Sequence, residues 1–142
     1  MLTAININAT RKYISKKEKP GDENPTVFHI GILDPFLRAH IEDKSTSFGL
    51  SSSNPEESAS ATLAMQKMNI QLVKFGVRDI ENFFDPVTKE TVKITLDTIS
   101  IGGKAYKALQ DKTLILLGGD MINELSQEVR KEQDLTGDEV KN

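Results

Sequence analysis

An apolar segment that runs directly into a helix start constrains the fold of this chain more than any other feature. Thr26–Leu33 alternates its side chains so that Phe28 and Ile30 share one face, as in a β-strand. Asp34 and Pro35 follow at once. Aspartate caps exposed helix amides, and proline at the first helical position loses no hydrogen bond. The sequence therefore predicts a strand and a helix joined without a spacer.

Two further segments are predicted to complete a small antiparallel sheet. Lys19–Pro25 is rich in turn residues, so Tyr13 and Ile14 before it are predicted to pair with the strand after it as an N-terminal hairpin. Thr91–Leu96 alternates apolar with polar residues and is predicted as a further strand. Val77–Phe84, between these regions, is predicted to be a short helix or turn.

The remaining elements are predicted to be helices. A first helix after Asp34 is expected to end near residues 44–47. A capping box at residues 54–57 opens a longer helix that Gly76 ends. Asp111 and Asp120 are each predicted to cap a later helix. The predicted buried stripes are Ala61, Met65, Met68, Leu72 and Phe75 in the long helix and Ile122, Leu125 and Val129 in the last, where Glu124, Gln127, Glu128, Lys131 and Glu132 are expected to point outward.

These elements predict an α+β fold in which a small antiparallel β-sheet, made of the N-terminal hairpin and the strand near 91–96, packs against about four helices. A length of 142 residues favours one domain. We expect that domain over residues 1–133, with a mobile serine-rich loop near 47–54. Residues 134–142 are expected to form a polar tail that frays.

The composition argues against most catalytic chemistry. The chain has no cysteine, which excludes disulfides, thiolate nucleophiles and cysteine-ligated metals. His29 and His40 lack metal-ligand spacing, so each is expected to be a partly buried surface residue, and its place in a strand favours packing for His29. Gly102, Gly103 and Lys104 resemble part of a phosphate-binding loop, but Ala105 stands where that motif needs serine or threonine. We therefore predict no enzyme activity, catalytic residue, cofactor or metal.

Charge leaves one alternative function open. The formal net charge is −3, but Arg11–Lys19 forms a local basic cluster. This cluster is either a solvated flank of the hairpin or a site for nonspecific phosphate contacts, which would make the chain a nucleic-acid-binding accessory factor. Tyr13 is its one aromatic residue, so base stacking is not supported and nucleic acid is not the expected partner. The sequence shows no signal peptide and no apolar run of bilayer length, so no membrane partner is expected.

Protein contact is the function that this pattern favours. Methionine side chains adapt to varied surfaces, so Met65 and Met68 are either core residues or part of an interface. Unpaired sheet edges at Tyr13 and Ile14 or along Thr91–Leu96 are able to accept a strand from a partner. The residues predicted to bind a partner are Tyr13, Ile14, Phe28, Ile30, Met65, Met68 and Phe83.

Four passages of the chain resemble small accessory proteins of tailed bacteriophages, which are encoded among virion morphogenesis genes and include the tail assembly chaperone type. The passages are Asn24–Asp34, Val73–Phe83, Leu114–Leu125 and Leu135–Asn142. The resemblance implies a non-enzymatic assembly protein in the host cytoplasm whose partners are other phage structural proteins. It equally implies the alternative of a minor virion protein, a connector, neck or tail subunit, which self-associates into a ring or other homo-oligomer.

Overall fold

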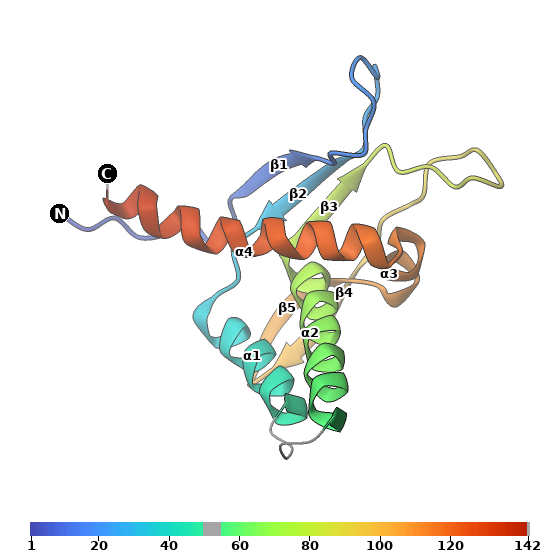
Figure 1. Ribbon diagram of the computed structural model, residues 1–142. Helices are drawn as coiled ribbons and strands as arrows, with labels where there is room; N and C mark the ends of the chain where they lie inside the picture. The colour runs from blue at the N-terminus through green and yellow to red at the C-terminus, as the bar shows by residue number, and fades with distance from the viewer. Residues whose placement is uncertain (50–54, 142) are drawn as a thin grey trace.

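The computed structural model describes residues 1–49 and 55–141, with side chains described at 1–43 and 62–133. The predicted α+β class is confirmed: four helices pack on a three-strand antiparallel sheet and a two-strand hairpin (Figure 1). In chain order the elements are β1 (Thr10–Ile14), β2 (Val27–Gly31), α1 (Pro35–Gly49), α2 (Pro55–Gly76), β3 (Val77–Glu81), β4 (Leu96–Ile101), β5 (Lys104–Leu109), α3 (Asp111–Leu117) and α4 (Gly119–Lys141).

The predicted N-terminal hairpin is confirmed. Strands β1 and β2 are antiparallel, with Tyr13 opposite Phe28 and Ile14 opposite Val27. Phe28 and Ile30 are fully buried, because alternation along β2 turns both toward the helices. Helix α4 crosses this face of the sheet (Figure 1). The hairpin therefore supplies one wall of the core.

The third strand of the sheet is β3, so the prediction of a helix or turn over Val77–Phe84 is wrong. Strand β3 pairs with β2, and the register shifts between His29 and Ile30. This irregularity leaves Arg78 as an extra residue, so Val77 and Ile80 are both buried although three positions separate them. A spacing of three imitates a helical stripe, which explains the error.

The strand predicted at Thr91–Leu96 is also wrong in position. The ladder begins at Leu96, and β4 pairs with β5 in a separate hairpin instead of joining the N-terminal one. Val92 and Ile94 are half-buried, but Thr91 makes only an isolated bridge to Phe84. Apolar alternation before β4 thus reflects packing without strand pairing.

The turn between β4 and β5 requires glycine. Gly102 has φ 58° and Gly103 has φ 81°, and a two-residue hairpin turn with positive φ at both positions matches the twist of the strands. The sequence carries a signal for this turn in its two successive glycines. It did not indicate the returning strand β5, whose Ala108 and Leu109 are fully buried.

The starts of the first two helices follow the predicted signals. The Asp34 carboxylate accepts a hydrogen bond of 2.8 Å from the Leu37 amide, which confirms the cap of α1. Helix α1 runs to Gly49, beyond the predicted end near 44–47, so residues 47–49 are helical. Residues 50–54, the rest of the predicted serine-rich loop, lie outside the described residues. Helix α2 begins at Pro55 and ends at Gly76, as predicted.

Gly76 brings α2 close to α4. A Cβ atom at this position would lie 2.7 Å from both methyl groups of Val129. Val129, Leu125 and Ile122 form the predicted buried stripe of α4. The first two helices and α4 therefore share one core with β2, β3 and β5.

The predicted caps of the last two helices are wrong by one residue or more. Gln110 occupies the N-cap position of α3 and makes no capping side-chain bond, so Asp111 is the first helical residue. Helix α4 starts at Gly119, and Asp120 lies within its first turn. The helix continues to Lys141, so the backbone of residues 134–141 is helical where a frayed tail was expected.

Candidate protein-binding surfaces

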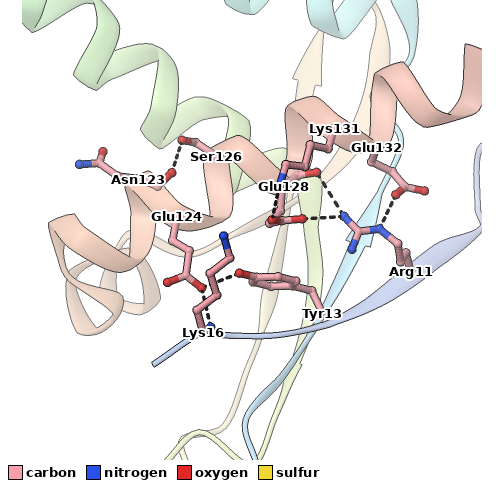
Figure 2. Close-up of polar contacts among 9 residues, drawn as sticks. All are labelled: Arg11, Tyr13, Lys16, Asn123, Glu124, Ser126, Glu128, Lys131 and Glu132. Carbon is pink, nitrogen blue, oxygen red and sulfur yellow. Dashed lines mark hydrogen bonds and ion pairs between the residues drawn. The ribbon is translucent and has the colours of Figure 1, made fainter. Parts of the chain in front are cut away.

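The first candidate surface is the basic cluster Arg11–Lys19, which begins on β1 and whose arginine faces α4. Arg11 Nε donates to Glu132 Oε2 at 2.6 Å, and Arg11 Nη2 donates to Glu128 Oε2 at 3.1 Å (Figure 2). Glutamates four residues apart lie on one face of a helix, and alternate residues lie on one face of a strand. Arg11 and Tyr13 therefore meet three carboxylates of α4 together. We call Arg11, Tyr13, Glu124, Glu128 and Glu132 the β1–α4 polar contact.

Tyr13 and Glu124 form the other half of this contact. The Tyr13 hydroxyl donates to Glu124 Oε2 at 2.7 Å, and the Lys16 amide donates to the same oxygen at 3.3 Å. Burial raises the pKa of Tyr13 above its ordinary value, and the bond to Glu124 raises it further. Burial alone would raise the pKa of Glu124, but hydrogen bonds from Tyr13, Ser15 and Lys16 hold it below the ordinary value. The ionised carboxylate is thus the form that the fold stabilises.

The β1–α4 polar contact corrects the outward orientation expected for part of α4. Glu128 is only 6% exposed, and Glu124 and Glu132 are half-buried. Gln127 and Lys131 are exposed as predicted, and Lys131 adds an ion pair of 3.1 Å to Glu128. The basic partner of the glutamates lies more than 100 residues away, so a helical pattern alone could not reveal it. The exposed cations of the cluster are Lys12, Lys16, Lys17 and Lys19.

The seven predicted partner-binding residues lie in different parts of the fold. Phe28 and Ile30 belong to the core, with only 1% and 0% of their surfaces exposed. Tyr13 is half-buried against α4, whereas Ile14 is 49% exposed on the edge strand β1. Phe83 is partly buried and lines a cavity of about 190 Å³ together with Phe28.

The two methionines of α2 differ in their surroundings. Met65 is 55% exposed, so core filling is the wrong interpretation for this residue. Met68 is partly buried and packs against the core. Buried Ala64 and Leu72 flank Met68 on the inner side of α2, which explains the shift of the predicted stripe. Met65 therefore remains available to a partner, and Met68 does not.

An exposed apolar surface lies at the short helix α3, outside the residues predicted from the sequence to bind a partner. Ile115 is 78% exposed, and Leu116 and Ile70 are exposed as well. Ile115 and Ile70 border a groove of about 450 Å³, which Leu114 and Ile122 also line. We call Ile70, Ile115 and Leu116 the α3 apolar surface. Its signal was the run of four apolar residues, 114–117, because a helix cannot bury four successive side chains against one neighbour.

A second groove lies between the β4–β5 hairpin and helices α1 and α2. Its volume is about 1030 Å³, and aromatic side chains from three elements line it: Phe36, Phe75 and Tyr106. His40 lies on this lining too. We call this space the hairpin groove. Gly102 and Lys104, which resembled a phosphate loop, belong to the hairpin turn and the strand after it.

The polar residues considered for chemistry are dispersed. His29 Nε2 lies 2.8 Å from Glu81 Oε2 across the β2–β3 pair, whereas His40 lies on α1. Nowhere in the described residues do three or more His, Asp or Glu side chains gather as a metal-binding group. Across the same part of the chain, every helix is too short or too polar to span a bilayer. No protein-family model matches the sequence, and comparison with curated proteins and with solved structures finds no significant match.

Proposed function

We propose that this chain is a non-enzymatic protein of tailed-bacteriophage assembly, of the tail assembly chaperone type, that acts by binding other phage proteins. The four passages described above, Asn24–Asp34, Val73–Phe83, Leu114–Leu125 and Leu135–Asn142, support the phage assignment. The observation that carries the binding function is the α3 apolar surface. It lies within the third of these passages and extends to α2 through Ile70.

Removing exposed apolar side chains from water is energetically favourable. Covering one isoleucine side chain contributes about 1.5 to 3 kcal/mol. Apolar patches that persist on a folded surface commonly mark sites of protein contact. Ile115 lies beside Gly118 and Gly119, where an added Cβ would meet no atom within 4 Å. The missing side chains keep the groove open, so an apolar side chain of a partner is able to enter beside Ile115.

The decisive experiment changes Ile115 in the phage that encodes this chain. We expect Ile115→Asp to reduce the number of tailed particles in electron micrographs and the plaque count, since a carboxylate would be desolvated in the interface. The matched control is Val87→Asp, because Val87 is also highly exposed but lies far along the chain from α3. Normal tails with the folded Ile115 variant, or after deletion of the gene, would refute the proposal.

A minor virion subunit is the second candidate, and residues 1–9 favour it. Every residue of this segment is exposed, and Leu2, Ile5 and Ile7 among them are large and apolar. Such a segment is suited to pairing with a neighbouring subunit. Mass spectrometry of purified virions separates the two candidates: a chaperone is absent from the particle, whereas a subunit is present at a fixed ratio to the tail proteins.

A further inference from the structure

The hairpin groove combines apolar walls with an open sheet edge. Ile99 and Ile101 of β4 contribute to one wall, and Phe36 of α1 to the opposite one. Phe75 lies deeper, edge-on to Tyr106 with ring centroids 6.4 Å apart. Figure 1 shows the β4–β5 hairpin beside α1 and α2, and side chains of all four elements line this space. At about 1030 Å³, the groove is large enough to accept side chains of another molecule.

The open edge favours an extended occupant. Among the described residues, β4 pairs with β5 alone, so its other edge carries unpaired backbone groups. Ser100 of β4 and Gly102 of the turn line the groove beside Ile99 and Ile101. Unpaired strand edges bind extended peptides through backbone hydrogen bonds, and adjacent pockets then select alternate side chains. An extended segment along β4 would satisfy both features together.

The charges of the lining favour an acidic occupant. Lys104 Nζ lies 3.6 Å from the centroid of the Phe36 ring, at the rim. The Lys74 side chain is only 20% exposed, and its one ion pair in the described residues is with Asp111, whose side chain is 83% exposed. An ion pair with a solvated carboxylate is worth little, so this ammonium group gains from a second carboxylate. Asp43 is the one carboxylate of the lining, against two lysines.

We infer that the hairpin groove binds an extended acidic segment of a partner protein, in which apolar side chains alternate with carboxylates. The apolar side chains contact Phe36, Ile99 and Ile101, and the carboxylates pair with Lys74 and Lys104. This assigns a second binding surface with its own partner chemistry. It goes beyond the proposed function and does not depend on the phage assignment.

The probe is a capped octapeptide of alternating leucine and aspartate, titrated into the isotopically labelled full chain at 0.15 M salt. We expect amide shifts at Ile99, Ser100 and Ile101, and an affinity about tenfold higher than that of the leucine–lysine counterpart. Equal binding of both peptides, no binding of the acidic peptide, or shifts confined to Ile70 and Ile115 would each overturn the inference.

Charge variants locate the site. Lys104→Glu is expected to weaken the acidic peptide about fivefold or more, because attraction becomes repulsion at the rim. Lys74→Gln, which keeps the size of a partly buried side chain, is expected to weaken it as well. The control is Lys107→Glu on the same strand, where Lys107 donates to Thr98 and does not line the groove. An equal effect of the Lys104 and Lys107 changes contradicts the inference.

The α3 apolar surface and the hairpin groove can be tested independently of each other. Ile115→Asp is expected to leave the acidic peptide bound, because Ile115 does not line the hairpin groove. If the Ile115 variant loses phage assembly but still binds the peptide, the result agrees with both the proposed function and the inference about the hairpin groove. A chain that assembles tails normally through the α3 apolar surface but never binds the peptide refutes only the inference about the hairpin groove.

Discussion

Helix α4 has two sides that reverse the usual roles of polar and apolar residues. On the side toward β1, Glu128 is buried and paired with Arg11. On the side toward α3, Ile122 lines a groove whose rim, Ile115, is exposed. The charged side thus joins the helix to β1, whereas Ile122, Leu125 and Val129 pack into the core and only the neighbouring Ile115 of α3 stays exposed. A buried glutamate here serves stability, whereas an exposed isoleucine of the adjoining α3 is available for binding.

The largest expected effect on stability comes from breaking the β1–α4 polar contact at its arginine. Arg11→Met leaves Glu128 buried with the exposed Lys131 as its one ionic partner among the described side chains. We expect the free energy of unfolding to fall by about 2 to 3 kcal/mol. Urea denaturation measures it, with Lys12→Met as the adjacent exposed control. A loss below about 0.5 kcal/mol would show that the contact is not structural.

A smaller effect is expected from the hydroxyl of Tyr13. Tyr13→Phe removes one hydrogen bond to the Glu124 carboxylate, which retains the Lys16 amide. We expect a loss of about 1.5 kcal/mol, typical of a bond to a charged group. The double variant with Glu124→Gln should lose less than the sum of the two single changes. Strict additivity would contradict direct coupling of the two side chains.

Acid should weaken the β1–α4 polar contact through protonation of Glu124. The pKa of folded Glu124 lies below the ordinary 4.5, so its stabilisation is complete above pH 4.5 and is lost as the pH falls through the folded value. Burial would raise the pKa of Asp34, but the Leu37 amide and other groups lower it below its ordinary value. The wild type therefore loses stability in acid from both carboxylates. Urea midpoints between pH 3 and 7 should therefore fall less steeply for Tyr13→Phe. Identical slopes would contradict this.

The smallest effect on stability is expected for Ile115, the exposed residue of α3. Ile115→Asp should change the free energy of unfolding by less than about 0.5 kcal/mol, because the side chain is largely solvated. The same substitution is expected to abolish partner binding. A loss above about 1.5 kcal/mol by urea denaturation would place Ile115 in the core, and the contrast between the two sides of α4 would disappear.

Local signals explain what could be predicted of the fold. Asp34 caps α1 because the cap, the proline and the preceding strand are adjacent in sequence. The β1–β2 pairing follows from a polar turn between two short apolar segments. Strand β3 could not be predicted in this way, because the bulge opposite His29 sets the spacing of its buried residues. A bulge depends on the partner strand, which a pattern within one segment does not contain.

The candidate surfaces also differ in whether a local sequence pattern could predict them. The α3 apolar surface was visible in principle, since the run of apolar residues at 114–117 exceeds what a helix buries. The hairpin groove was not, because Phe36, Lys74 and Lys104 come from three elements whose arrangement depends on tertiary packing. Phe28 and Ile30 were predicted to bind a partner but are buried in the core. The residue types suited to an interface are also those that fill a core.

The long separation between Arg11 and Glu128 has a consequence for synthesis of the chain. The two residues lie 117 positions apart, so the ribosome must release nearly all of the described sequence before they can meet. Until then β1 holds a cation and a tyrosine hydroxyl that only water solvates. Strand β1 is thus secured by a helix that is synthesised much later, and a nascent chain stalled before α4 would carry β1 without its anchor.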